Sequence, residues 1–394
     1  MKRLLTVSLT MGLAAAANAQ SSVTLYGIVD NGLQYETGFA HGNRVSAESG
    51  NWGESRFGLK GKEDIGAGTS VNFTLESRLN TQNGSVANGS LFEGQATVGM
   101  SNDAYGSFRL GNFGASALLQ YAGVLDPQQT QKYSFGTLVR GRMFPQTANG
   151  IEYKTPSFGG FTVQAQYNLT NSTTWNAGNP GTAPGQLGTS TGLGSSQGRS
   201  DGVKLEYNAH QLDLQAIYDE IRDGNGKFSN VYLASRSIFA AGSYIWGPVT
   251  VYAGYQHLSA PDASDAGYFG TSTPTALPAG VGLPTAVDSG WVGAQWAVTP
   301  ATYVTGAIYH ANANKGNGNA TMYTLSGQYL LSKRTRLYSE VGYLHNSSTS
   351  NLGLNGGLYG ANVNNDPVNG NPSSTNPNYG HGQFGVFAGI ATQF

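Results

Sequence analysis

The sequence predicts an all-β fold, a transmembrane antiparallel β-barrel of about sixteen strands. Apolar and polar residues alternate with a period of two along most of the chain, as in residues 71–76 and 161–167. The connections between these segments are alternately long and short. After the first 20 residues, no run approaches the ~20 consecutive apolar residues of a membrane-spanning helix. Because only helices and closed barrels satisfy every backbone polar group in lipid, a barrel is the remaining way to cross a membrane.

The first 19 residues have the layout of a secretory signal peptide. Lys2 and Arg3 are followed by an apolar run over residues 4–13 and by small residues that end in Ala17-Asn18-Ala19. An ordinary buried N-terminal helix is the alternative. We expect cleavage after Ala19, a single barrel domain over residues 20–394, and a location in the outer membrane of a Gram-negative cell.

The composition supports a barrel and excludes several other classes of protein. Only 11% of residues are charged, against ~25% in typical globular domains. The 22 tyrosines outnumber the 16 phenylalanines, and tyrosine suits a membrane–water boundary. The chain has no cysteine, so it has no disulfide and no thiolate metal site. A net charge of −1 gives no electrostatic basis for binding nucleic acid.

Sixteen alternating segments are expected to be strands. They lie at residues 23–35, 51–63, 69–80, 91–101, 105–111, 148–155, 160–168, 201–208, 211–219, 236–246, 249–257, 289–298, 302–310, 320–331, 334–345 and 382–394. Long connections are expected at 36–50, 81–90, 112–147, 169–200, 220–235, 258–288, 311–319 and 346–381, with turns of two to five residues between the other strands. Long loops at one end and short turns at the other are typical of an outer-membrane barrel, whose long loops are extracellular.

The last strand ends on an aromatic residue, Phe394, which is the final residue of the sequence. This residue is interpreted as a signal read by the outer-membrane assembly machinery, and an ordinary C-terminal strand is the alternative.

Four stretches of the sequence resemble the general trimeric porins of β-proteobacteria, of the Neisseria, Bordetella and Burkholderia types. They are residues 21–30 (SSVTLYGIVD), 55–68 (SRFGLKGKEDIGAG), 95–111 (QATVGMSNDAYGSFRLG) and 149–167 (NGIEYKTPSFGGFTVQAQY). The resemblance implies sixteen strands, a homotrimer of identical subunits, and a third loop that folds inward and narrows each pore. That loop corresponds to residues 112–147. It departs from the family pattern because Asp126 is its only acidic residue.

The alternation predicts which charged side chains point into the pore. Arg56, Lys60, Arg78 and Arg109 have the inward parity, as do Glu76 and Glu152. The third loop adds Asp126, Arg140 and Arg142. We expect these nine residues to form the pore constriction, with an excess of basic groups that favours anions. Alternatively, the basic residues are ordinary interior residues paired with Glu76, Glu93 or Glu152.

The function expected from these features is general diffusion of small hydrophilic solutes and ions, with outer-membrane lipid and lipopolysaccharide as surroundings. No enzyme motif and no metal-ligand spacing is found, so no catalytic residue and no cofactor is expected. A substrate-specific channel, a non-channel surface protein such as an adhesin, and an outer-membrane enzyme are the competing functions.

Overall fold

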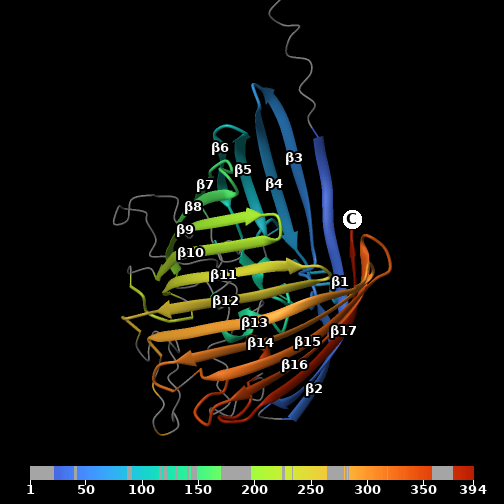
Figure 1. Ribbon diagram of the computed structural model, residues 1–394, viewed down its shortest axis with the longest axis vertical. Helices are drawn as coiled ribbons and strands as arrows, with labels where there is room; N and C mark the ends of the chain where they lie inside the picture. The colour runs from blue at the N-terminus through green and yellow to red at the C-terminus, as the bar shows by residue number, and fades with distance from the viewer. Residues whose placement is uncertain are drawn as a thin grey trace, which may run out of the picture.

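The computed structural model describes the strands and part of the loops (Figure 1). The described residues are 22–39, 42–86, 91–114, 118, 122–129, 131–139, 142, 149–169, 197–223, 227–232, 234–263, 279, 282, 284–316, 318–356 and 376–394. The expected signal peptide and Arg140 lie outside this part of the chain.

The strands follow one another around a single antiparallel sheet. In the first half they are β1 (Ser22–Phe39), β2 (Gly42–Ser49), β3 (Arg56–Gly66), β4 (Thr69–Arg78), β5 (Gln95–Asn102), β6 (Gly106–Asn112), β7 (Gly150–Lys154), β8 (Phe161–Leu169) and β9 (Gln197–Ala209). In the second half they are β10 (Leu212–Asp223), β11 (Arg236–Trp246), β12 (Val249–Ser259), β13 (Ala286–Thr299), β14 (Thr302–Ala313), β15 (Ala320–Leu330), β16 (Thr335–Asn346) and β17 (Gln383–Gln393).

The sheet closes on itself where the first strand meets the last. One edge of β1 pairs with β17, from Ile28 opposite Gln393 to Glu36 opposite Gly385. The other edge is shared, because β3 pairs with the start of β1 and β2 pairs with its end. The 17 strand segments therefore occupy 16 positions around the ring, and the expected barrel of about sixteen strands is confirmed.

The expected loop over residues 36–50 is wrong. Strand β1 continues to Phe39, and Gly42–Ser49 returns along it as β2, with Leu33 opposite Ala47 and Tyr35 opposite Val45. The segment alternates Arg44, Ser46 and Glu48 with small or branched apolar residues, which is a strand pattern too short to separate from a polar loop by sequence alone. The true break in pairing comes at residues 50–55, before β3 begins.

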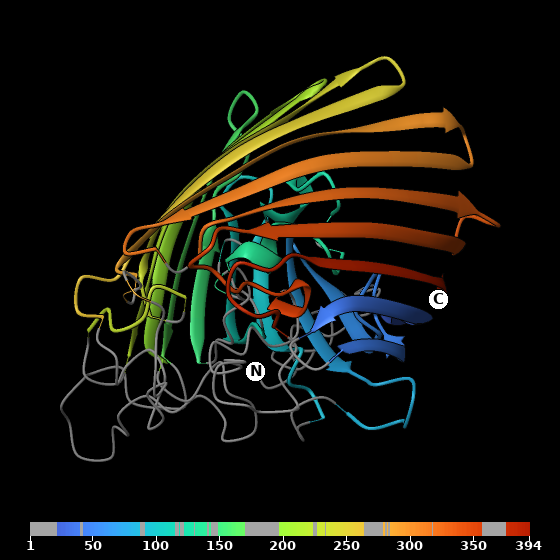
Figure 2. The same ribbon diagram turned by 90° about the horizontal axis from the view of Figure 1, so that it is seen from below.

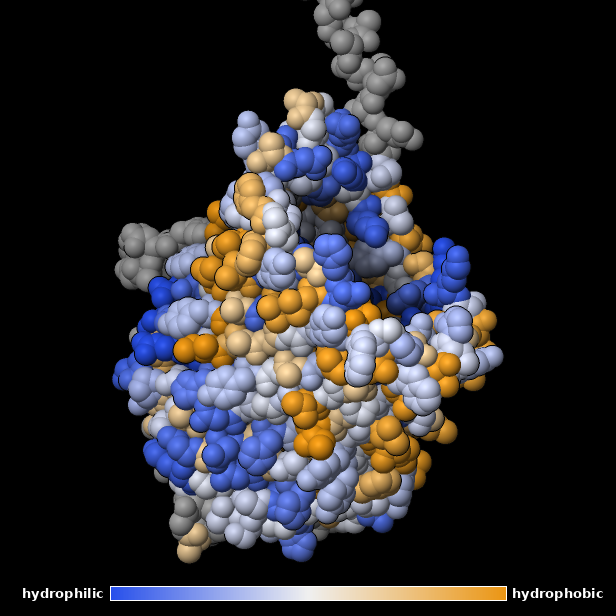
Figure 3. Space-filling model, in the orientation of Figure 1, coloured by the Kyte–Doolittle hydropathy of each residue, from blue (hydrophilic) through white to orange (hydrophobic). Residues whose placement is uncertain are grey.

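The two faces of the wall follow the predicted alternation. Large apolar side chains such as Val98, Val292 and Leu325 are exposed on the outer face, while polar side chains such as Gln256, Ser289 and Glu340 are buried inside. Hydrophobic side chains lie across the outer face of the barrel in Figure 3. None of the helices in the described part of the chain is long and apolar enough to cross a membrane.

Asp30 of β1 ties the closing strands to the break between β2 and β3. Its carboxylate Oδ2 accepts hydrogen bonds from the backbone N–H of Trp52 at 2.9 Å and of Gly53 at 2.8 Å. Its Oδ1 accepts a hydrogen bond from the hydroxyl of Tyr338 on β16. Asp30 is fully buried, so these donors replace the water that an isolated carboxylate requires.

We expect Tyr338→Phe to lower the free energy of unfolding by about 1–3 kcal/mol, because the buried carboxylate of Asp30 loses a donor. Guanidinium unfolding of the refolded barrel, followed by tryptophan fluorescence, measures the change. Tyr329→Phe is the matched control, since Tyr329 is exposed on the outer face. Equal unfolding midpoints for the two variants would contradict this role of Asp30.

Candidate pore constriction

The third loop leaves the wall after β6 and crosses the interior of the barrel. Its described part contains the 3-10 helix η2 (Ala122–Leu125) and the single-turn helix α2 (Phe135–Leu138). Figure 2 shows this segment enclosed by the curved wall. The inward-folded loop is therefore confirmed.

Apolar side chains of the loop pack on the interior of β11–β17. The ring of Phe135 lies 4.3 Å from that of Trp291 on β13, and the ring of Tyr133 lies 5.1 Å from that of Phe387 on β17. Five further loop residues are buried in the same cluster, namely Leu118, Ala122, Leu125, Leu138 and Val139. Their burial removes apolar surface from water and holds the loop against this half of the wall.

Polar contacts set the position of the loop along the wall. The indole Nε1 of Trp291 donates to the carbonyl oxygen of Leu125 at 3.0 Å. Gln128 donates to Thr324 Oγ1 at 2.9 Å and accepts from Ser326 Oγ at 2.6 Å, both on β15. Because these partners lie on β13 and β15, the loop lies against one side of the interior. The wall formed by β3–β9, which these contacts do not involve, is called the open side.

Asp126 joins two parts of the loop to each other and to the wall through hydrogen bonds. Its carboxylate accepts hydrogen bonds from Tyr309 Oη at 2.5 Å, from the N–H of Phe135 at 2.9 Å and from the N–H of Gln128 at 3.0 Å. Burial raises the pKa of Asp126 to about 6, although these three donors favour the ionised form. The carboxylate of Glu340, on β16, is also fully buried beneath the loop and interacts electrostatically with Asp126.

Arg142 is buried at the edge of the loop. Its Nη2 lies 2.7 Å from Asp219 Oδ2 of β10, and its Nε donates to Ser235 Oγ at 2.8 Å. The residue is 1% exposed. Neither Arg142 nor Asp126 is open to the water of the interior, so both hold the loop on the wall in this structure.

The four basic residues predicted on the wall lie on β3, β4 and β6 of the open side. Arg56 and Arg78 face each other across β3 and β4, and Lys60 lies on the same face of β3, four residues after Arg56. The Nζ of Lys60 is 5.2 Å from the centre of the Tyr26 ring. Arg109 is on β6, directly opposite Glu152 on β7.

Three of these basic residues are paired with carboxylates. Arg56 Nε lies 3.4 Å from Glu76 Oε2, and Arg109 Nε lies 2.7 Å from Glu152 Oε1. Arg78 lies between two acids, with Nε 2.9 Å from Glu54 and Nη1 3.5 Å from Glu93. The structure therefore brings the predicted wall residues together as alternating charges.

Sequence analysis did not name several charged residues of the interior, and three of them lie near the predicted ones or face the interior from β9 and β16. Glu54 lies in the break between β2 and β3, where alternation gives no direction. Arg336 of β16 has its guanidinium 3.8 Å from the centre of the Trp52 ring and donates to Gln328. Lys204 of β9 pairs with Glu206 at 2.9 Å. The parity rule places Arg336 and Lys204 inside, so it could have found both.

Comparison with known proteins gives the family. The family model described as Gram-negative porin matches residues 5–349. The chain belongs to this family. An outer membrane porin protein of Bordetella pertussis is 29% identical over 377 residues, which cover 88% of this chain and 94% of that protein. Outer membrane porin protein 32 of Delftia acidovorans is 31% identical over 182 residues, 42% of this chain and 49% of that protein.

Solved porin structures share the fold. The anion-selective porin from Comamonas acidovorans has a TM-score of 0.71 at 24% identity, covering 95% of this chain and 100% of that one. OmpT, an outer membrane protein of Vibrio cholerae, has a TM-score of 0.59 at 13% identity, covering 96% and 100%. Because the chain belongs to the Gram-negative porin family, it is a channel of the outer membrane rather than an enzyme, and it passes small hydrophilic solutes and ions.

We expect the third loop to be docked more firmly at pH 5 than at pH 8. The pKa of Asp126 is about 6 in the docked loop, above its ordinary value of 3.8. Docking of the loop therefore takes up a proton at Asp126. The stabilisation of the docked loop by this proton is fully present below pH ~4 and is lost as the pH rises through ~6. The docking equilibrium is expected to be about tenfold more favourable at pH 5 than at pH 8.

Hydrogen exchange of the amides of residues 122–139, corrected for intrinsic rates, measures this equilibrium. Asp126→Asn is expected to reduce the pH dependence, and Asp103→Asn, in the turn after β5, is expected to preserve it. Equal protection of the wild-type loop at both pH values would show that Asp126 does not control docking.

Proposed function

We propose that this porin passes anions in preference to cations. The observation that carries the proposal is the difference in exposure within the ion pairs of the open wall. The side chain of Arg56 is 39% exposed against 19% for Glu76, and that of Arg109 is 26% exposed against 8% for Glu152. Guanidinium groups therefore meet the passing solute more than the carboxylates that neutralise them. Arg78 and Lys204 are exceptions, because Arg78 is 8% exposed against 21% for Glu54, and Lys204 is 4% exposed against 18% for Glu206.

The opposite side of the passage supports the same preference. The only acidic residue of the third loop, Asp126, is withdrawn into the contact with the wall. Arg336 faces the interior from β16, and within the described part of the chain no carboxylate lies within 4.0 Å of it. Lumen charges set the selectivity of a pore, so this balance favours anions. The similar porin from Comamonas acidovorans is named as anion-selective.

We further propose that nine residues set the constriction, with two roles. Arg56, Lys60, Arg78, Arg109, Glu76 and Glu152 line the passage, whereas Asp126 and Arg142 fix the loop that narrows it. Arg140 belongs to the same loop, outside the described residues.

Assembly and export complete the proposal. The functional unit is a homotrimer, as in the trimer form of the Vibrio cholerae protein. Residues 1–19 direct export and are cleaved. The strand ending at Phe394 is the recognition element for the outer-membrane assembly machinery, and the barrel is surrounded by outer-membrane lipid and lipopolysaccharide. The N–H of Gly27 donates to the terminal residue's carbonyl at 3.2 Å, so this end of the chain takes part in closing the ring.

We expect the porin, inserted in a planar bilayer that separates two salt concentrations, to give a reversal potential whose sign shows that anions permeate more readily than cations. Glu152→Gln leaves Arg109 without its 2.7 Å partner and should increase the anion preference, whereas Arg56→Gln should reduce it. Single-channel recording makes both measurements, and conductance steps in threes would support the trimer.

Glu63→Gln is the matched control, because Glu63 lies on β3 with the outward parity and should leave selectivity unchanged. A cation-selective reversal potential in the wild-type protein would overturn the anion proposal without affecting the fold. Conductance that always rises and falls in single steps, never in groups of three, would contradict the proposed trimer.

A further inference from the structure

A cluster of arginine and carboxylate side chains lies on the outer face of the barrel, at the loop end of β9–β11. Its members are Arg199, Asp201, Glu220, Arg222 and Arg236. They share the outward parity of Val203, Tyr218 and Ile238, which are exposed on the apolar face. Charged residues are rare on the lipid side of a barrel, so this cluster requires an explanation.

Glu220 is the centre of the cluster. Its carboxylate is 2.6 Å from Arg222 Nη2 and 3.4 Å from Arg236 Nε, and it accepts a hydrogen bond from Tyr218 Oη at 2.5 Å. On the neighbouring strand, Arg199 Nε lies 2.9 Å from Asp201. The ring of Phe228 has the guanidinium groups of Arg222 and Arg236 at 4.2 and 4.3 Å from its centre.

The surface that the cluster presents is cationic. Three arginines stand against two carboxylates. The side chains of Arg199, Arg222 and Arg236 are 39%, 26% and 46% exposed, against 32% for Asp201 and 11% for Glu220. In Figure 3 hydrophilic side chains gather at the left, where Figure 1 places the loop ends of β11 and β12. Guanidinium groups held in this way match the geometry of a phosphate group.

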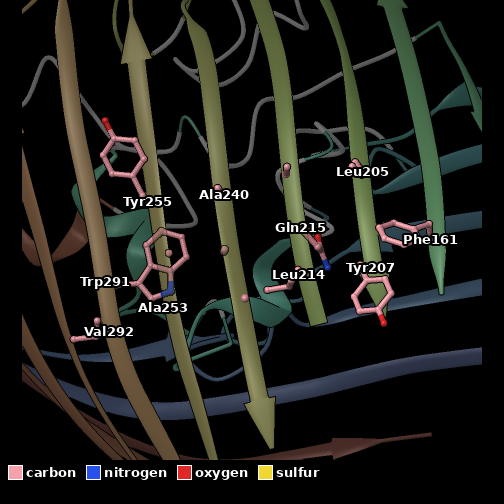
Figure 4. Close-up of a pocket in the computed structure, with 14 residues that line it drawn as sticks. Phe161, Leu205, Tyr207, Leu214, Gln215, Ala240, Ala253, Tyr255, Trp291 and Val292 are labelled. Atoms are coloured by element: carbon pink, nitrogen blue, oxygen red, sulfur yellow. The ribbon is translucent and has the colours of Figure 1, made fainter. Parts of the chain in front are cut away.

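An apolar groove of about 660 Å³ lies on the same strands, nearer the turn end. Its floor consists of small residues, namely Ala216, Ala240, Gly242 and Ala253, and its sides include Leu205 and Val292. Figure 4 shows Tyr255 at one end of the groove and Tyr207 and Phe161 at the other, with Ala240 between them.

The groove and the cluster are aligned along the strands. Arg236 and Ala240 are four residues apart on β11, and Glu220 and Ala216 are four residues apart on β10. At ~3.3 Å per residue, the charged groups lie about 13 Å above the floor of the groove. A molecule with an anionic head and an apolar tail fits this arrangement. Asp288 marks one border of the groove, with its carboxylate held by Tyr255 and by His257 Nδ1 at 2.8 Å.

We propose that this face binds a phosphorylated lipid of the outer leaflet, with the phosphate on Arg199 and Arg236 and an acyl chain in the groove. The long-loop end of a porin faces the exterior of the cell, so the cluster lies at the level of outer-leaflet headgroups. A free phosphate accounts for the arginines but leaves the groove without a role, and an uncharged lipid accounts for the groove alone. The site is separate from the pore and does not depend on its ion selectivity.

Native mass spectrometry of the refolded full-length barrel with purified lipid A tests the site, with dephosphorylated lipid A as the second probe and inorganic phosphate as the third. We expect phosphorylated lipid A to bind and the other two to bind at least tenfold more weakly. The double variant Arg199→Gln, Arg236→Gln is expected to weaken lipid A binding roughly 30-fold, since each arginine near an anionic lipid contributes about fivefold. Ala240→Phe, which fills the groove, should also weaken it.

Matched controls separate the site from general effects. Lys333→Gln with Arg334→Gln removes two cations at the turn end, and Ala388→Phe adds the same ring to the outer face of β17. Both should retain wild-type affinity, and single-channel conductance shows that every variant is folded. Equal binding of phosphorylated and dephosphorylated lipid, or an unchanged affinity in the double arginine variant, would overturn the proposal. Cross-linking of β10 and β11 to a second copy of the chain would show that a subunit occupies this face instead.

Discussion

The pairing of β1 with β17 is the constraint on which the rest of this porin depends. A sheet in lipid has no water to satisfy an open edge, so its backbone groups are paired only if the first strand meets the last. Nine residue pairs join these strands, and the terminal residue adds hydrogen bonds to Gly27. Asp30 extends the connection to Tyr338 on β16 and to the break after β2. The ring keeps its 16 positions although two segments, β2 and β3, share one side of β1.

Closure creates an interior that the third loop divides unequally. The apolar residues of the loop cover β11–β17, and the paired charges of β3–β7 lie on the part of the wall that these residues leave uncovered. The paired charges on the open side nearly balance, so the proposed anion preference rests on which member of each pair is more exposed. Under that proposal the orientation of an ion pair in the wall matters for permeation as well as for stability.

The sequence predicted the strands well because each strand repeats one rule, with apolar side chains outward and polar ones inward. It also placed the third loop, on the strength of the family resemblance. The alternation rule gives no prediction for strands with few apolar residues or for loops. Residues 42–49 form a strand with too little apolar character to show the pattern. Asp126 and Arg142 lie in a loop, where parity predicts no direction, and only the fold shows that both are buried. The pairing of Arg56 with Glu76 was one of two interpretations that the sequence left open, and the register of β3 and β4 decides between them.

The contacts of the third loop have a consequence for the order of folding. Leu125 binds a residue 166 positions later in the chain, Asp126 one that is 183 positions later, and Gln128 one that is 196 positions later. Contacts between such distant residues form late, because the intervening chain must first lose its freedom. The binding surface for the loop exists only after β13, β14 and β15 have joined the sheet. The place of the third loop in the interior is therefore decided by the second half of the chain, although the loop itself belongs to the first half.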